Sequence, residues 1–344
     1  MIILSVESTC DETAVALVRD GREVLTDQVF SQADLHAVYG GVVPEIASRS
    51  HVEVIYQLAD RAVQAAGIEK QQIDAVAVSF APGLIGAVLV GVNFAKSAAA
   101  ALGVPLIPVH HIRGHIAANY LAFPELAPPF VCLAISGGNS LIVDVRDYTD
   151  MEVMGATRDD AAGECFDKVA RVLGLGYPGG KPLDALSRGG DDTKYHFPVA
   201  KVEGRPYDMS FSGLKTAAIN LIHHAEQTGE ALDLPSLCAS FAKGVGDSLV
   251  PRAVAALREK GYRKLVAAGG VAANSRIRAD LQRAAAAAGA ALFIPPLRLC
   301  GDNGAMVGAQ AYYEFLAGHT AGSDLNAYAS MELGAVNVRG EHER

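Results

Sequence analysis

The sequence contains no tryptophan, few other aromatic residues and no long hydrophobic run. Aromatic residues make up 6% of the 344 residues, which argues against a surface that binds nucleic acid mainly by stacking bases on aromatic rings. The most apolar stretch, residues 84 to 95, is interrupted by glycine and closed by Lys96. It is well short of the roughly 20 residues of a membrane span, so we expect no membrane anchor.

Cysteine is scarce, and negative charge outweighs positive charge. Five cysteines are scattered along the chain and none stands in Cys-x-x-Cys spacing, which indicates neither a disulfide framework nor a zinc ribbon. We therefore expect a reducing, cytoplasmic location. The formal net charge of −9 disfavours a protein that coats phosphate backbones by itself. An RNA substrate would need local basic contacts or a basic partner.

The two halves of the sequence repeat one order of elements. Three strand-like segments separated by turns open each half, at residues 2–6, 13–19 and 23–29 and again at 130–135, 140–145 and 152–156. A strand, helix and strand follow in each half, from residue 73 to 109 and from 263 to 295. Such crossovers imply parallel strand pairing. The sequence thus predicts an α/β protein with duplicated ribonuclease-H-like lobes, in the two-lobed arrangement of actin and sugar kinases.

The repeat also predicts the domain organisation. We expect a first lobe at residues 1–129 with a helical insertion at about 31–66, and a second lobe at 130–330 with a mostly helical insertion at about 157–260. Residues 331–344 read as a polar tail. In proteins built this way, a cleft between the lobes holds a nucleotide, so we expect an adenylate or ATP there.

A candidate metal site comes from two histidines and one aspartate. His111 and His115 are four residues apart after a predicted strand, so one helical turn places both imidazoles on one face. Asp302 follows the equivalent strand of the other half, and the repeat symmetry places it across the cleft from the histidines. Such a set leaves coordination positions free for a substrate. The alternative is that the histidines are ordinary polar helix residues and that Asp302 is a helix N-cap.

Zinc proteases also contain two histidines at this spacing, in the motif His-Glu-x-x-His. The glutamate of that motif is the general base. Ile112 occupies its position in this chain. The sequence therefore disfavours metalloprotease chemistry and favours an acyl transfer, in which the metal only has to polarise a carbonyl.

Several turns have the composition of a nucleotide site. Backbone amides at Ser136-Gly137-Gly138 and Gly269-Gly270 could hold a phosphate, and the acidic turn Asp11-Glu12 could hold a metal-bound phosphate or handle a proton. The alternatives are tight turns that need glycine and carboxylates that cap a turn.

Asp167 and Asp184 stand beside further glycine turns. Their carboxylates suit ribose hydroxyls or an amino-acid ammonium. For Asp167, the alternative is a helix ion pair with Arg171.

These motifs, taken in order, closely resemble those of the bacterial tRNA N6-adenosine threonylcarbamoyltransferases, formerly labelled O-sialoglycoprotein endopeptidases. The resemblance covers nearly the whole chain. It rests on residues 7–13, 36–51, 111–115, 136–138, 166–168, 177–180, 210–215, 269–274 and 302–305.

The resemblance implies an enzyme that transfers a threonylcarbamoyl group from threonylcarbamoyl adenylate to N6 of adenosine 37, in tRNAs reading codons that begin with A, and releases AMP. It also implies one divalent metal per subunit held by His111, His115 and Asp302, with Fe2+ favoured and Zn2+ as competitor. The implied partners are tRNA, a shorter actin-like paralogue and a small P-loop ATPase. The implied substrate contacts are Ala134, Ile135, Ser136, Gly137, Gly138, Asp167, Gly180, Asp184 and Asn274.

Two positions depart from the family pattern. The family commonly has His after Ser-Gly-Gly and Pro after Tyr-Pro-Gly-Gly, whereas this chain has Asn139 and Lys181. Lys181 places a positive charge near the implied substrate.

The competing interpretations of the sequence are an actin-like ATPase or kinase and a nucleotide-binding scaffold. A kinase would hold Mg2+ with oxygen ligands rather than imidazoles.

Overall fold

The computed structural model describes residues 1–335 and divides the chain into two compact units. Of the described residues, the first unit contains 1–128, 147–151 and 301–335, and the second contains 129–146 and 152–300. Of the predicted polar tail, only residues 331–335 lie within the described part of the chain.

A five-stranded sheet forms the centre of the first unit, in the order β3-β2-β1-β4-β5. Strand β1 pairs antiparallel with β2 and parallel with β4, which in turn pairs parallel with β5. Alternate side chains of a strand point to opposite faces. Ile2, Leu4 and Val6 therefore join one hydrophobic core, and Ser5 and Glu7 point to the other face. The strands are β1 (Ile2–Glu7), β2 (Glu12–Arg19), β3 (Glu23–Ser31), β4 (Ala75–Ala81) and β5 (Leu106–His110).

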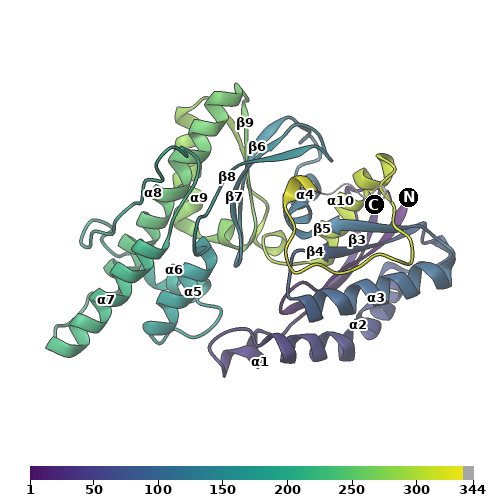
Figure 1. Ribbon diagram of the computed structural model, residues 1–344, viewed down its shortest axis with the longest axis horizontal. Coiled ribbons are helices and arrows are strands. Elements are labelled where there is room, and N and C mark those ends of the chain that lie inside the picture. Colours follow the sequence, from purple (N-terminus) through teal and green to yellow (C-terminus); the bar gives the residue numbers. More distant parts are fainter. Residues whose placement is uncertain (336–344) are drawn as a thin grey trace. The chain divides into compact units, whose positions relative to one another are not determined.

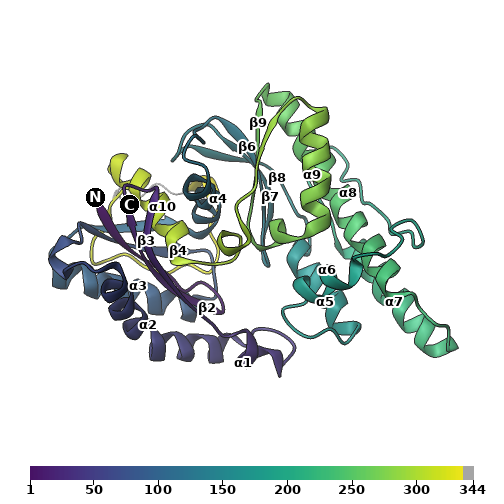
Figure 2. The same cartoon turned by 180° about the vertical axis from the view of Figure 1, so that it is seen from behind.

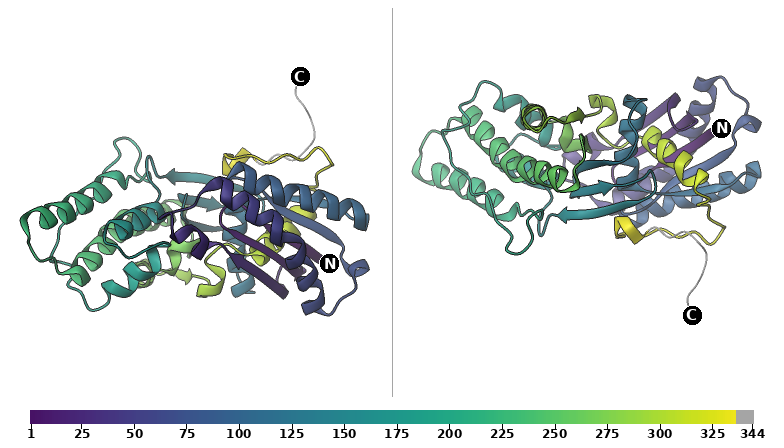
Figure 3. Two further views of the ribbon diagram at one scale, coloured as in Figure 1. Left: turned by 90° about the horizontal axis from the view of Figure 1, so that it is seen from below. Right: turned by 90° about the horizontal axis from the view of Figure 1, so that it is seen from above.

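Helices cover both faces of this sheet (Figure 1). Helices α2 (Pro44–Ala66) and α3 (Ile85–Leu102) pack on one face. Helix α10 (Gly304–Leu316) packs on the other, against β1 and β2, with α4 (His111–Ala122) beside it. Figure 3 gives the view from below, with α2 and α3 in front, and the view from above, with α10 in front. The short α1 (Ala33–Ala37) and η1 (Lys70–Gln72) precede and follow α2, and η4 (Leu333–Ala335) ends the described chain.

The second unit repeats the same sheet. Its strand order is β8-β7-β6-β9-β10. In both sheets, therefore, the third, second, first, fourth and fifth strands of the unit lie side by side in that order. Strand β6 again pairs antiparallel with the following strand and parallel with β9. The predicted duplication is therefore confirmed in topology as well as in element order. The strands are β6 (Phe130–Ile135), β7 (Ser140–Val145), β8 (Met151–Ala156), β9 (Lys264–Ala268) and β10 (Ala291–Phe293).

The predicted helical insertion fills the second unit between β8 and β9. The long helix α8 (Leu234–Lys260) packs on β6 and β9 and beside α9 (Ser275–Ala287), as Figure 2 shows from behind. Phe166 and Phe241 meet edge to face in the core of this unit, with ring centroids 5.5 Å apart. The remaining elements are α5 (Ala162–Val172), α6 (Gly180–Ser187), α7 (Ser212–Thr228), η2 (Gly270–Ala273) and η3 (Leu297–Leu299).

The predicted end of the second lobe differs from the structure. We expected that lobe to continue to residue 330, but the chain joins the first unit at Gly301. The physical reason is the packing of α10, whose glycines let it lie directly on β1 and β2. A Cβ atom on Gly304 would lie 2.7 Å from the backbone nitrogen of Ala16, so only glycine fits this contact.

Within residues 1–335, one helix is long and apolar enough to be compared with a membrane span. It is α3, whose window from Ile85 to Leu102 is one-third buried. Length and composition alone are weak grounds for a span, and in the structure α3 packs against α2 and β4. Its buried positions Ala87, Gly91 and Ala95 recur every four residues, as in a helix that covers one face of a sheet.

Candidate metal centre and nucleotide pocket

The histidine pair lies at the start of α4. Strand β5 ends at His110 and the helix begins at the next residue. The side chain of His110 accepts a hydrogen bond from the backbone N–H of Ile112 at 3.2 Å and so caps the helix. The predicted helical spacing is confirmed, because His111 and His115 lie edge to face with ring centroids 4.6 Å apart. Both side chains are almost completely buried.

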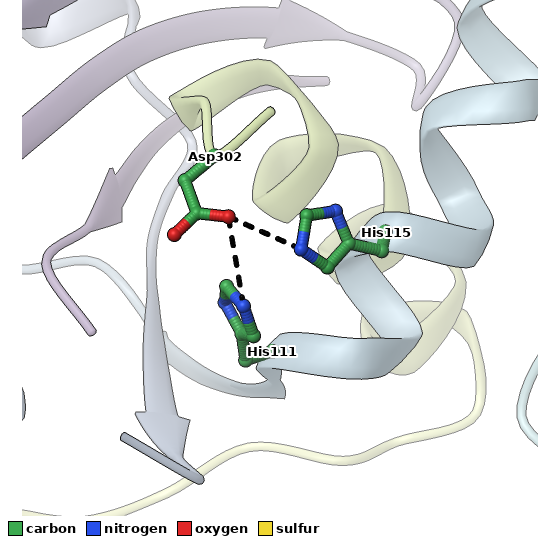
Figure 4. A group of neighbouring side chains, drawn as sticks. All are labelled: His111, His115 and Asp302. Atoms are coloured by element: carbon green, nitrogen blue, oxygen red, sulfur yellow. Dashed lines mark ion pairs between the residues drawn. The ribbon is translucent and has the colours of Figure 1, made fainter. Parts of the chain in front are cut away.

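Asp302 approaches the histidines from the segment just before α10 (Figure 4). Its Oδ1 lies 3.7 Å from Nε2 of His111 and 3.1 Å from Nε2 of His115. The ligand atoms of the three residues all lie within 4.8 Å of one another. The expectation that Asp302 lies across a cleft was wrong, since Asp302 belongs to the same unit as the histidines. The return of the chain to the first unit brings it there.

The three residues fit a divalent metal. Among the described residues, the buried Nδ1 of His115 has no hydrogen-bond partner, and the only group close to its buried Nε2 is the carboxylate of Asp302, 3.1 Å away. Buried polar atoms without a partner are costly, and a cation between the imidazole and the carboxylate would satisfy Nε2. Two imidazoles and one carboxylate are a donor set that suits Fe2+ or Zn2+ and that leaves coordination positions open.

Glu7 contacts the site and was not singled out from the sequence. Its carboxylate is fully buried, and its Oε2 lies 3.0 Å from Nδ1 of His111. The hydroxyl of Ser79 donates to the same oxygen at 2.5 Å, and the backbone N–H of Thr9 donates to Oε1 at 2.6 Å. The sequence does contain one indication of this role. Ser5 and Glu7 stand at alternate positions of an otherwise apolar strand, so they face the same side of the sheet.

The carboxylates and imidazoles shift one another's pKa values. Burial by itself would raise the pKa of Asp302, but the nearby imidazoles outweigh it and lower that pKa to about 2. Burial would lower the pKa of His111, but the charges of Glu7 and Asp302 raise it to about 9. The site therefore favours positive charge between these carboxylates, as a cation site does.

The acidic turn between β1 and β2 lies near this group. Burial raises the pKa of Glu12 to about 9, with further contributions from the charges of Asp302 and Asp11. The hydroxyl of Ser31 donates to Glu12 at 3.2 Å. Asp11 is buried, and its backbone carbonyl accepts from the N–H of Gln32. The structure thus brings Glu12 into the electrostatic environment of Asp302, with Asp11 as its neighbour.

A second candidate site is a cavity of about 650 Å³ in the second unit. This volume is typical of small-molecule sites. Five of the predicted substrate residues line it, and the two helix N-termini at Gly180 and Asn274 border it. These five predicted substrate contacts are Gly137, Asp167, Gly180, Asp184 and Asn274, and Gly270 of the predicted phosphate turn lines the cavity as well.

Several polar groups around this cavity already have partners. The amide oxygen of Asn274 accepts from two backbone N–H groups at the start of α9. Asp184 accepts from the backbone N–H and the hydroxyl of Ser275, at 2.9 and 2.7 Å. Asp167 accepts from the N–H of Gly179 at 2.8 Å. These carboxylates therefore tie the helices together as well as lining the cavity.

The other predicted substrate residues do not line it. Ala134 and Ile135 are buried at the end of β6, and Ser136 and Gly138 form the turn that follows. Lys181, Arg188 and Phe166 line the cavity without having been predicted as contacts. Phe166 belongs to the family motif at residues 166–168, whereas Arg188, which follows the end of α6, stands in no motif that could mark it.

Comparison of the sequence with known proteins gives one family throughout. The family model described as TsaD, tRNA N6-adenosine threonylcarbamoyltransferase, matches residues 23–309. A tRNA N6-adenosine threonylcarbamoyltransferase from Clostridium botulinum (strain Kyoto / Type A2) is 47% identical over 332 residues, covering 96% of this chain and 98% of the relative. One from Caldicellulosiruptor saccharolyticus is 46% identical over 333 residues, covering 97% and 98%.

Comparison with solved structures shows the fold. HypF from T. kodakarensis matches with a TM-score of 0.61 at 16% identity, covering 94% of this chain and 49% of that chain. Component A of (R)-2-hydroxyglutaryl-CoA dehydratase from Acidaminococcus fermentans matches with a TM-score of 0.53 at 14% identity, covering 91% and 98%. Together with the repeated sheets, these likenesses confirm the predicted actin-like fold.

We expect the Asp302→Ala variant to lose metal. Removing one of three ligands should weaken binding by at least about 100-fold, since even supporting residues of metal sites are worth about 10- to 100-fold. The metal content of purified protein, loaded with Fe2+ or Zn2+ and dialysed, measures this by elemental analysis. His224→Ala, an exposed histidine on α7, is the matched control and should keep the metal. An Asp302→Ala protein that retained one metal per chain would contradict the assignment.

Proposed function

This chain belongs to the family of tRNA N6-adenosine threonylcarbamoyltransferases, and from that premise we propose how it performs its part of tRNA threonylcarbamoyladenosine modification. It transfers the threonylcarbamoyl group from threonylcarbamoyl adenylate to N6 of adenosine 37, in tRNAs that read codons beginning with A, and AMP leaves. The observation that carries the proposal is the meeting of His111, His115 and Asp302 within 4.8 Å.

The metal ligands come from the first unit. His111, His115 and Asp302 would hold a divalent metal, with Fe2+ favoured and Zn2+ as the competitor. Bound there, the metal would polarise the carbonyl of the threonylcarbamoyl group as a Lewis acid. The protein's contribution is to keep the ligands buried and aligned on one helix and one short segment. An imidazole-rich donor set also favours this role over an actin-like ATPase, whose Mg2+ prefers oxygen ligands.

The cavity of the second unit is the proposed adenylate site. Helix N-termini carry N–H groups without helical partners and partial positive charge. The N-terminus of α6, which no side chain caps, therefore suits a phosphate at this cavity, whereas the first N–H groups of α9 already donate to Asp184 and Asn274. Apolar side chains such as Phe166 and Leu297 offer surface for the adenine, and Asp167 offers a carboxylate for ribose hydroxyls. The proposed substrate contacts remain those named from the sequence: Ala134, Ile135, Ser136, Gly137, Gly138, Asp167, Gly180, Asp184 and Asn274.

Asp11 and Glu12 remain the proposed proton-handling residues. The support is the position of Glu12, whose pKa is raised to about 9 by burial and by the charge of Asp302. Transfer to an exocyclic amine releases a proton, which only an ionised carboxylate can accept. Glu12 would therefore take up this proton only in its ionised form, and Asp11 is the alternative acceptor.

We propose a cytoplasmic location, which a tRNA substrate supports. The acidic net charge of the chain favours a tRNA surface shared with partners. We propose that a shorter actin-like paralogue binds over α2 and α3, and that a small P-loop ATPase completes the system. The support is a set of exposed apolar side chains on these adjacent helices. They are Val52 and Tyr56 on α2 and Ile85 and Leu89 on α3, which are 42–66% exposed.

The first test measures transfer. Radiolabelled threonine, bicarbonate, ATP and the helper proteins should give labelled tRNA with the unmodified chain, and His111→Ala should reduce the rate by at least about 100-fold, because losing a Lewis acid removes several kcal/mol of transition-state stabilisation. Glu12→Gln in the same assay tests proton handling. Full activity of His111→Ala would refute the metal role. No transfer by the unmodified chain would favour an ATPase or a scaffold.

The second test concerns the nucleotide pocket. Lys181 lies on its wall, so its ammonium should attract an anionic ligand. We expect Lys181→Ala to weaken AMP binding roughly 3- to 10-fold at low salt, as for a partly screened charge. Calorimetric titration measures this, with Lys201→Ala, an exposed lysine outside the pocket lining, as control. Unchanged affinity would show that AMP binds elsewhere or that its phosphate does not approach Lys181.

The third test concerns the paralogue surface. Tyr56→Glu places a charge on the exposed apolar face of α2 and should weaken the heterodimer by roughly 10-fold or more, as substitution of a central interface aromatic does. Analytical ultracentrifugation of the two purified proteins measures the change. Leu316→Glu, at an equally exposed apolar position at the end of α10, is the control. Equal affinities of the two variants would place the partner on another surface.

A further inference from the structure

Glu7 is a buried carboxylate with neither lysine nor arginine paired to it among the described residues. It ends β1 on the face that carries Ser5, and its side chain is fully buried. Among the described residues, no lysine or arginine forms an ion pair with it; its one ion-pair partner is His111. Removing a carboxylate from water costs several kcal/mol unless it is paired and hydrogen-bonded. The cost of burying the carboxylate of Glu7 therefore has to be offset by the contacts that this carboxylate makes.

The hydrogen bonds of Glu7 use both carboxylate oxygens. Oε1 accepts from the N–H of Thr9 and Oε2 accepts from the hydroxyl of Ser79. Ser79 lies on β4, which pairs with β1, so two strands hold the carboxylate in place. Its remaining contact is the imidazole of His111, with 3.0 Å between Oε2 and Nδ1.

This contact decides which nitrogen of His111 carries the hydrogen. The hydroxyl of Thr9 also lies 3.2 Å from Nδ1, and a hydroxyl can donate or accept. An ionised carboxylate can only accept hydrogen bonds, so Nδ1 carries the hydrogen and donates to Glu7. In the neutral imidazole the lone pair is then on Nε2, the nitrogen that lies 3.7 Å from Oδ1 of Asp302. The geometry therefore directs the ligand atom of His111 towards the carboxylate of the metal site.

His115 has no equivalent support. Its buried Nδ1 has no hydrogen-bond partner among the described residues. The two imidazoles of the pair thus differ at Nδ1: a carboxylate contacts this atom in His111 but not in His115. Carboxylates that orient a metal-bound histidine also increase its basicity as a ligand.

We propose that Glu7 is a positioning residue of the metal site, which fixes the tautomer and ring orientation of His111 so that Nε2 binds the metal. The inference rests on the metal site of the proposed function and adds to it a residue outside the ligand set. It assigns to Ser79 a smaller role, that of holding Glu7 in its orientation.

The test measures metal binding by the full chain without tRNA or helper proteins. Glu7→Gln keeps the shape of the side chain and removes its charge, so the Zn2+ dissociation constant should rise roughly 10- to 100-fold, the range for supporting residues of metal sites. Ser79→Ala keeps the carboxylate and should raise it less than about 10-fold. Competition with a chromophoric chelator gives the constants.

Glu314→Gln is the matched control. Glu314 is likewise a buried glutamate of the first unit, but it pairs with Arg113 at 2.9 Å. Its substitution should destabilise the fold without changing Zn2+ affinity. Thermal unfolding of the metal-free variants shows whether each is folded.

A second measurement reports the tautomer directly. In the zinc-loaded unmodified protein, nitrogen NMR should show His111 with a proton on Nδ1 and metal on Nε2, and in Glu7→Gln the Nδ1 proton should exchange faster. The inference fails if folded Glu7→Gln binds Zn2+ within about twofold of the unmodified chain, or if Glu314→Gln loses as much affinity. An unmodified chain that bound no metal would overturn the proposed metal site as well, which distinguishes the two failures.

Discussion

The close contact between helix α10 and strands β1 and β2 is the constraint on which the candidate metal site depends. Gly304 and Gly308 remove the side chains that would otherwise separate helix and sheet. A Cβ atom on Gly308 would lie 2.7 Å from Cγ2 of Val18 and 2.8 Å from the hydroxyl of Ser5. That hydroxyl instead donates to the carbonyl of Gly304 at 2.8 Å. The segment before the helix is thereby held beside α4, and Asp302 reaches the histidines.

The same face of the sheet supplies the supporting groups. Alternation along β1 places Ser5 and Glu7 towards α10 and α4, while Ile2, Leu4 and Val6 face the core under α2 and α3. One strand thus serves the hydrophobic core with one face and the polar site with the other. A one-residue shift in its register would exchange the two sets, so the pairing of β1 with β2 and β4 determines both stability and chemistry.

The two units share a sheet topology but carry different chemistry. The first unit has buried imidazoles and carboxylates at the junction of β5 and α4. The second has a nucleotide-sized cavity bordered by glycine turns and helix N-termini. Gly269, beside the cavity of the second unit, must be glycine for two reasons. Its φ is +90°, and a Cβ atom on it would lie 2.3 Å from the carbonyl oxygen of Ile135. A fold like that of HypF from T. kodakarensis does not by itself fix function; the residues at these turns do.

The sequence alone determined the strands, the repeat, the helical spacing of His111 and His115 and the family. These features depend on local periodicity and on motifs, which a linear chain displays directly. Only the tertiary structure decided that Asp302 belongs to the histidines' own unit, that Glu7 contacts His111 and that Arg188 lines the cavity. Those contacts join residues far apart in the chain, and their distances depend on how helices pack on a sheet, which no local pattern encodes.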